Sequence, residues 1–239
     1  MLNAALLGAV CASSLLVGFA LTGRWTGPRL IGMIMGFGAG ALLSAIAYEL
    51  IPASDLGQPG TALAVALGAL SFFIGDWLVD RRGGKDRKAL GGEPPGSGSA
   101  IFIGTLLDNI PESLVLGMGL ITGGTINVAF AAAVFASNLP EGVAGTTNLA
   151  AAGRPRSAIL RMWLALVLVS ALAAALGYAL VLTVPAVDGH MLEAFAAGAM
   201  LTMLADTMMP EALEHGGPLV GLVTVLGFLA AAALSVRSG

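Results

Sequence analysis

The seven residues "LDNIPES" (107–113) place two carboxylates, an amide and a proline inside a segment that is otherwise apolar enough to cross a bilayer. A related stretch, "SNLPEG" (137–142), lies in the next apolar segment. A charged side chain at the bilayer centre costs roughly 3 kcal/mol on insertion scales. Two such stretches in neighbouring segments therefore indicate a site, because something must offset that cost in each.

The composition predicts a polytopic membrane protein. Of the 239 residues, 57% are hydrophobic and only 10% are charged, against roughly a quarter charged in soluble domains. The net charge of -3 provides no basic face for phosphates, so nucleic acid is not an expected partner. The single cysteine, Cys11, excludes a disulfide within the chain and a thiolate metal cluster.

Apolar segments of spanning length occur eight times. A hydrocarbon core about 30 Å thick requires about 20 helical residues, and lipid requires the backbone to satisfy its own hydrogen bonds. We therefore expect an all-α integral membrane domain over residues 1–239. Its eight transmembrane helices are expected at about 3–22, 30–51, 61–79, 100–121, 125–149, 158–184, 191–213 and 218–236.

The polar segment 81–99 is rich in Gly, Pro, Ser and charge, which predicts a flexible loop. Of the 11 Lys and Arg residues, all except Arg237 follow the first, third and fifth expected spans. Basic residues beside spans remain cytoplasmic, so the 81–99 loop is predicted to be cytoplasmic and both termini extracytoplasmic. The richness in Ala and Gly is typical of a high-GC bacterium, which suggests the bacterial inner membrane.

Two internal repeats are visible. Residues 36–52 align without gaps on residues 194–210 at an offset of 158, and the two proline-centred stretches align on each other. An odd number of crossings separates each copy from its partner, so the copies run in opposite directions. The sequence therefore predicts a 3+2+3 inverted-repeat bundle of the kind found in transporters. Chance similarity between Ala- and Gly-rich spans is the alternative for the first match.

The polar residues of the fourth and fifth spans form the candidate metal site. Asp108 and Glu112 are four residues apart and share a helix face, and Ser137 and Glu141 repeat that spacing. Basic side chains are absent from the sequence of these spans, which leaves a cation or protons to neutralise the acids. The predicted site comprises the following residues: Asp108, Asn109, Glu112, Ser137, Asn138 and Glu141.

The prolines of this site have a predicted role as well. Pro111 and Pro140 lack an N–H, which is predicted to release the carbonyls of Leu107 and Ala136 from the helix ladder. Proline and asparagine also occur in ordinary membrane helices as kinks and interhelical contacts, which is the alternative interpretation of either residue alone.

Further acids lie near the ends of the repeated spans. Glu49 and Asp206 precede Pro52 and Pro210, and Glu211 follows directly. These three are candidates for entrance, exit or proton-linked residues. A simple interfacial position is the alternative for Glu49 and Asp206, and a solvated helix end is the alternative for Glu211.

The paired N-x-P-E cores at 109–112 and 138–141, in the fourth and fifth of eight spans, resemble the ZIP (Zrt-, Irt-like protein) divalent metal transporters. The resemblance covers nearly the whole chain. It implies uptake of a divalent metal, zinc first with manganese, iron or cadmium as alternatives, by an elevator-type motion in a homodimer. It implies neither an enzymatic activity nor a resident cofactor.

This sequence departs from the family pattern where Asp108 and Ser137 stand in place of the usual histidines. An all-oxygen site favours harder cations such as Mn²⁺ or Fe²⁺. A proton-coupled carrier of a small organic cation would use the same acids and is the main alternative. An intramembrane metalloenzyme is disfavoured, because the spans hold no H-E-x-x-H sequence.

Overall fold

The computed structural model of the chain describes residues 1–23, 27–51, 59–81, 98–122, 124, 126–184 and 188–238. Among these residues every regular element is helical and no strand occurs. The expected all-α class is therefore confirmed. The helices are α1 (Leu2–Ala12), α2 (Ser14–Leu21), α3 (Pro28–Ala45), η1 (Ile46–Leu50), α4 (Pro59–Val79), α5 (Gly98–Thr122), α6 (Val128–Ala151), α7 (Arg156–Thr183), α8 (Gly189–Met203), η3 (Leu204–Met208), α9 (Met209–Gly216), η4 (Gly217–Leu219) and α10 (Val220–Ser238).

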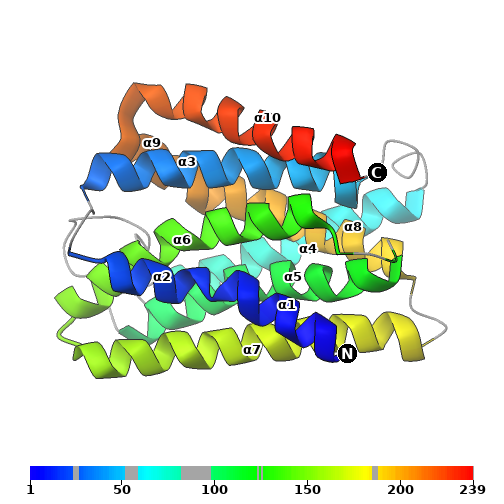
Figure 1. Ribbon diagram of the computed structural model, residues 1–239, viewed down its shortest axis with the longest axis horizontal. Helices are drawn as coiled ribbons and strands as arrows, with labels where there is room; N and C mark the ends of the chain where they lie inside the picture. The colour runs from blue at the N-terminus through cyan, green and yellow to red at the C-terminus, as the bar shows by residue number, and fades with distance from the viewer. Residues whose placement is uncertain are drawn as a thin grey trace.

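Within the described residues, seven helical segments are long and apolar enough to cross a membrane. The expected seventh and eighth spans form one continuous segment, Gly189–Val236, of 48 residues. At 1.5 Å per residue that segment would be about 72 Å long if straight, more than twice a hydrocarbon core. It bends instead at Gly217, which has a φ of 73°, and Figure 1 shows the chain reversing between α9 and α10.

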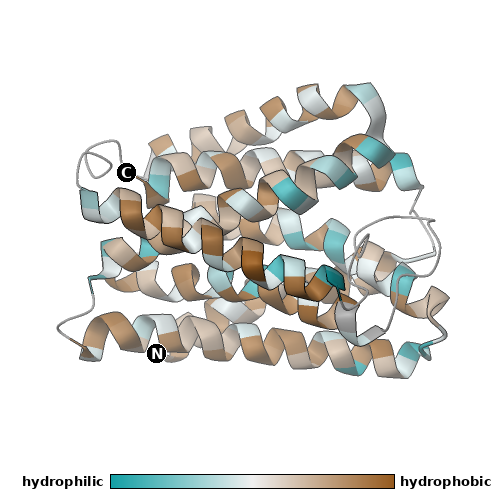
Figure 2. Cartoon of the chain, turned by 180° about the vertical axis from the view of Figure 1, so that it is seen from behind, coloured by the Kyte–Doolittle hydropathy of each residue, from teal (hydrophilic) through white to brown (hydrophobic). Residues whose placement is uncertain are grey.

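The two ends of the bundle differ in charge. Figure 1 shows the N- and C-termini at the same end, which we call the terminal end. The opposite end, the basic end, carries Arg29 in the first turn of α3, Arg81 two residues after the end of α4, and Arg156 at the start of α7. The guanidinium of Arg81 lies 3.8 Å over the ring of Trp77. Figure 2 shows hydrophilic residues gathered toward this end.

Large apolar side chains cover the outside of the bundle. Examples are Leu63 on α4, Leu168 and Leu172 on α7, and Leu222 on α10, which are between 59 and 67% exposed. Such exposure over several long helices is not stable in water but suits contact with lipid. Together with the seven apolar segments, it indicates a multi-pass membrane protein.

The helices pack as two groups. The first group comprises α1, α2, α5, α6 and α7, which contact one another, and the second comprises α3, α4, α8, α9 and α10. The two groups meet mainly where α3 packs on α6 and where α5 packs on α8. The candidate site residues on α5 and α6 therefore belong to the first group and lie beside its border with the second.

The repeat found in the sequence also appears in the backbone. Two of the π-helical segments, η1 (46–50) and η3 (204–208), are separated by the same offset of 158 residues. Gly40 packs directly on the backbone of Thr224, and Gly198, its partner at the same offset, packs directly on the backbone of Val65. Each half thus repeats the same bend and the same close helix contact.

Three details differ from the sequence expectation. The first expected span is broken at Ser13, whose hydroxyl donates to the carbonyl of Val10 at 2.7 Å. The fifth begins at Val128 rather than 125, because the side chain of Asn127 caps it by accepting from the N–H of Phe130 at 2.9 Å. The expected loop at 81–99 lies mostly outside the described residues, and residues 98 and 99 already belong to α5.

Candidate functional site

The helices α5 and α6 bury all six residues of the predicted site. The exposed fractions lie between 0 and 3% for Asp108, Asn109, Glu112, Ser137, Asn138 and Glu141. Both helices continue through their prolines, from Gly98 to Thr122 and from Val128 to Ala151. The three acids therefore lie inside the protein, where an unneutralised charge is expensive.

Glu112 connects the two helices. The Nδ2 of Asn138 donates to Oε2 of Glu112 at 3.1 Å, and the hydroxyl of Ser137 lies 3.5 Å from Oε1. The Ser137 hydroxyl also donates to the carbonyl of Val134 at 2.9 Å, so its bond to Glu112 is the weaker of the two. The structure thus brings together three of the predicted residues, one from α5 and two from α6.

Asn109 presents a buried amide oxygen. Its Nδ2 donates to the carbonyl of Thr105 at 3.0 Å, which fixes the orientation of the side chain. Its Oδ1 accepts no hydrogen bond among the described residues, although the residue is only 1% exposed. Buried polar atoms without a partner are rare in native proteins and call for an explanation such as an ion. Amide oxygens are among the ligands that hard cations prefer.

The backbone of α3 lies close to the carbonyl of Ala136, which Pro140 is predicted to release from the helix ladder. A Cβ added to Gly38 would lie 2.8 Å from Cα of Ser137 and 3.1 Å from the carbonyl oxygen of Ala136. Gly38 therefore lets α3 approach α6 at the proline-containing turn. At this point α3 covers the site with the backbone of Gly38, which has no side chain to contribute.

The three buried acids of α5 and α6 do not form a tight cluster of ligand atoms. Among the described residues, the group whose His, Cys or carboxylate ligand atoms all lie within 4.8 Å of one another is Glu211, Glu214 and His215 on α9. The Nδ1 of His215 lies 3.6 Å from Oε2 of Glu211 and 2.9 Å from the carbonyl of the same residue. This group lies at the basic end, since α9 leads to the bend at Gly217.

The other predicted acids have separate surroundings. Glu49 on η1 accepts from Nδ2 of Asn127 at 2.5 Å and from the hydroxyl of Ser235 on α10. Asp206 on η3 is exposed. The predicted entrance and exit residues therefore lie apart from the buried site, and Glu211 joins the group on α9.

Two buried acids were not predicted from the sequence. Glu193 on α8 is 6% exposed and accepts from the hydroxyl of Thr122 at 2.6 Å, while Asp76 on α4 is 8% exposed. Their signal in the sequence was an acid within an expected span, the same signal that identified Asp108. Near the end of a span, an acid that faces water at the membrane interface gives the same pattern, so the sequence does not distinguish it from a buried acid.

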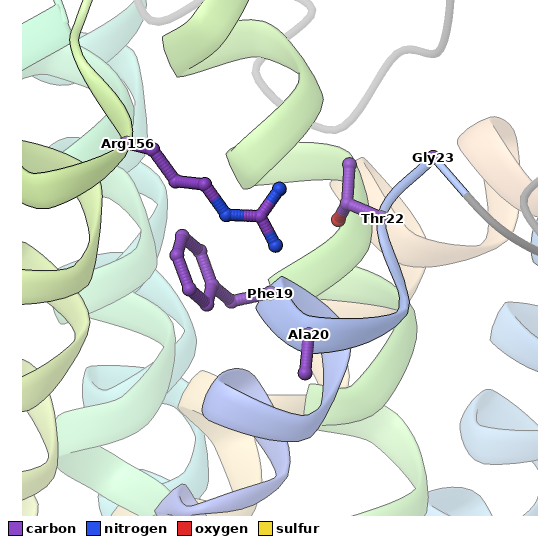
Figure 3. A pocket seen from close by; sticks show the side chains of 5 residues that line it. All are labelled: Phe19, Ala20, Thr22, Gly23 and Arg156. Atoms are coloured by element: carbon purple, nitrogen blue, oxygen red, sulfur yellow. The ribbon is translucent and has the colours of Figure 1, made fainter.

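A pocket at the basic end lies away from these acids. It is lined by Phe19, Ala20, Thr22, Gly23 and Arg156 (Figure 3). The guanidinium of Arg156 lies 4.8 Å from the centre of the Phe19 ring, the geometry of a cation–π contact. The described residues that line this pocket include no acid, so they offer no carboxylate to a cation.

Comparison of the chain with protein-family models finds no match. Comparison with curated proteins also finds no match.

Proposed function

We propose that this chain is a ZIP-like carrier that moves a divalent metal cation, zinc first, across the bacterial inner membrane into the cytoplasm. The supporting observation is the buried junction of α5 and α6. There, Asn109 offers an amide oxygen without a hydrogen-bond partner among the described residues, one turn from the carboxylate of Glu112. A cation bound between them would neutralise the charge and satisfy the oxygen.

The cargo would be held by oxygen atoms. A cation that binds Glu112 replaces the hydrogen bonds that this carboxylate receives from Ser137 and Asn138. Asp108 and Glu141 supply further charge from the same buried turns of the two helices. Such a set suits Mn²⁺ and Fe²⁺ and also admits Zn²⁺ and Cd²⁺.

The transport architecture would be eight crossings in a 3+2+3 inverted repeat. The bend at Gly217 divides the last helical segment into two limbs, and both termini lie at one end, as an even number of crossings requires. The repeated π-helical turns and the matched contacts of Gly40 and Gly198 support the inverted halves. Transport would move the first group of helices, which carries the site, along the second.

The direction of transport follows from charge. Basic residues gather at the end opposite the termini, so that end would be cytoplasmic and the termini extracytoplasmic. Glu211, Glu214 and His215 would then receive the metal on the cytoplasmic side. The exposed apolar faces of α4 and α10, which include Leu63 and Leu222, would contact lipid and the second copy of a homodimer.

Metal uptake into proteoliposomes tests the proposal. Zn²⁺, Mn²⁺, Fe²⁺, Cd²⁺ and Mg²⁺ should be compared for the wild type and for the double variant Glu112→Ala, Glu141→Ala. Uptake of at least one divalent metal that disappears in the double variant is expected. Equal accumulation by the wild type and the variant, for every metal, would reject the site. The proton-coupled carriage of a small organic cation would then become the leading function.

A further inference from the structure

The two groups of helices are joined by a carboxylate hydrogen bond on each of their two main contacts. Where α3 meets α6, the Nδ2 of Asn127 donates to Oε2 of Glu49 at 2.5 Å. Where α5 meets α8, the hydroxyl of Thr122 donates to Oε1 of Glu193 at 2.6 Å. In each pair the donor belongs to the first group and the carboxylate to the second.

Both bonds lie at the terminal end of the bundle. Thr122 is the last residue of α5 and Asn127 caps the start of α6, so the two donors flank the short connection between these helices. Glu49 lies at the end of η1, and Glu193 lies one turn into α8. One bond ties the end of α5 to α8, and the other ties the start of α6 to η1. Together they restrain both helices of the α5–α6 hairpin at the terminal end.

The side chains involved are held in place by other contacts. Oδ1 of Asn127 accepts from the N–H of Phe130, which orients Nδ2 toward Glu49. Glu49 also accepts from Ser235 within its own group. Glu193 is only 6% exposed. The donor and the carboxylate oxygen are 2.5 Å apart in one bond and 2.6 Å apart in the other, so both contacts restrain the two groups relative to each other.

The internal repeat allows the four bonding residues to be compared with the corresponding residues at the basic end. At the offset of 158 residues, Glu193 corresponds to Met35 and Glu49 to Thr207. In the alignment of the two proline-centred stretches, Asn127 corresponds to Gly98 and Thr122 to Ala151. Met35, Gly98 and Ala151 have no side-chain group that could form the equivalent bonds. The aligned positions at the basic end therefore cannot form the same two bonds.

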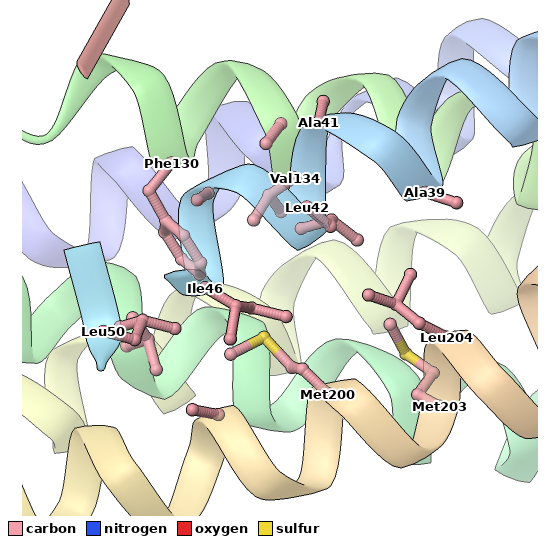
Figure 4. Close-up of a cluster of buried hydrophobic side chains, with 14 of the residues drawn as sticks. Ala39, Ala41, Leu42, Ile46, Leu50, Phe130, Val134, Met200, Met203 and Leu204 are labelled. Carbon is pink, nitrogen blue, oxygen red and sulfur yellow. The ribbon is translucent and has the colours of Figure 1, made fainter. Parts of the chain in front are cut away.

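Below these bonds the same interface is closed by apolar side chains. Figure 4 shows Leu42 and Ile46 from the second group facing Phe130 and Val134 of α6, with Met200 of α8 beside them. All five are at most 2% exposed. Phe130 and Val134 precede Ser137 along α6, so this cluster lies between the two hydrogen bonds and the turn of α6 that contacts Glu112.

We propose that the Asn127–Glu49 and Thr122–Glu193 bonds form a latch that keeps the terminal end of the protein closed. The latch biases the equilibrium toward the arrangement described here, because the repeat-related positions at the basic end cannot form the same bonds. This inference goes beyond the proposed function and does not depend on the identity of the cargo. It can fail while metal uptake stands, and it can hold if no metal is carried.

The test measures access to a buried cysteine placed beneath the latch. A protein with Cys11→Ala and Val134→Cys, in lipid nanodiscs without added metal, is reacted with a water-soluble maleimide. Thr122→Val removes one donor at constant shape, and Asn127→Ser removes the amide donor while keeping a side chain that caps the helix. Each variant should raise the modification rate by about ten-fold, the change in an equilibrium expected from the loss of one buried hydrogen bond.

Three controls distinguish opening of the interface at the latch from general unfolding of the protein. Ser235→Ala removes a hydrogen bond to the same Glu49 carboxylate, but from within the second group, so the rate should stay within about two-fold of the parent protein. Thr122→Ser restores the hydroxyl and should restore the parental rate. Leu166→Cys, in place of Val134→Cys, reports on a second buried cluster that the latch does not cover.

Several outcomes would overturn the latch. Unchanged modification at residue 134 in both donor variants would show that the bonds do not restrain opening. An equal rise with Ser235→Ala would show that Glu49 acts only within the second group. A rise at residue 166 as well as at residue 134 would show that the variants unfold the protein rather than open it.

Discussion

Asn138 on α6 donates a hydrogen bond to Glu112 on α5 at 3.1 Å, and both residues are at most 2% exposed. The bond joins the two proline-containing helices at a carboxylate, the group that binds divalent cations most readily. The chemistry of the proposed transport is thus concentrated at a point where two helices with related sequences cross.

Replacement of Glu112 by Gln keeps the size of the side chain and removes its charge. We expect metal uptake to fall at least about ten-fold, because a neutral amide does not offset the charge of a divalent cation in a buried site. The measurement is initial uptake in proteoliposomes at matched protein content. Ser14→Ala is a suitable control, since it also removes a buried polar group, one bonded to the carbonyl of Cys11. Equal losses in both variants would contradict a specific role for Glu112.

Gly38 allows α3 to lie against the backbone of α6. An alanine there would place Cβ 2.8 Å from Cα of Ser137, so Gly38→Ala should lower the free energy of unfolding by about 1–3 kcal/mol. Gly119→Ala on α5 is the matched control, because a Cβ there meets nothing within 4 Å. It should be neutral or stabilise by up to about 1 kcal/mol through helix propensity. Thermal unfolding in detergent compares the two, and a more stable Gly38→Ala protein would contradict the packing described.

His215 supplies the only nitrogen ligand of the group on α9 among the residues described there. His215→Ala should weaken zinc binding at this group by at least about ten-fold and lower the number of zinc ions bound per chain by about one. Equilibrium dialysis followed by metal analysis measures both. His190→Ala is the control. The His190 side chain is 66% exposed at the terminal end, and its one carboxylate contact among the described residues is Oε2 of Glu193, 3.4 Å from its Nδ1. An unchanged zinc count in the His215 variant would exclude a role for this group in metal exit.

Acid pH should inhibit transport. Protons compete with metal for the carboxylates of the site, and metal binding favours the ionised form. Metal binding is therefore stronger at high pH than at low pH, and uptake should be slower at about pH 5 than at about pH 8. Uptake measured at equal pH on both sides of the vesicle checks this. A flat profile over that range would contradict release of the metal by protonation.

The helical class and the central part of the site follow from the sequence. Helical periodicity places Glu112 and Asp108 on one face, and the shared N-x-P-E pattern predicts that their helix meets the one carrying Ser137 and Asn138. The structure brings Glu112, Ser137 and Asn138 together as expected. This contact is predictable because the residues lie within two turns of their helices, where spacing alone fixes the direction of each side chain.

The remaining polar contacts depend on tertiary packing that the sequence does not reveal. Glu193 lies near the end of a span, where an acid commonly faces water. Its burial depends on Thr122, which is 71 residues away. The sequence predicts how far along a span a residue lies. Near the end of a helix, however, the neighbouring helix decides which face is buried.

The position of the two π-helical turns bears on the origin of the chain. A π turn closes its hydrogen bonds one residue further along than an α turn and therefore holds one more residue. Residues 46–50 and 204–208 contain this extra residue at the same place in sequences that align without a gap. A single insertion in an ancestral half, copied by duplication of its gene, would account for both. A chain of roughly half the present length, inserted in both orientations and paired with itself, would then have carried the same bend before the two copies were fused.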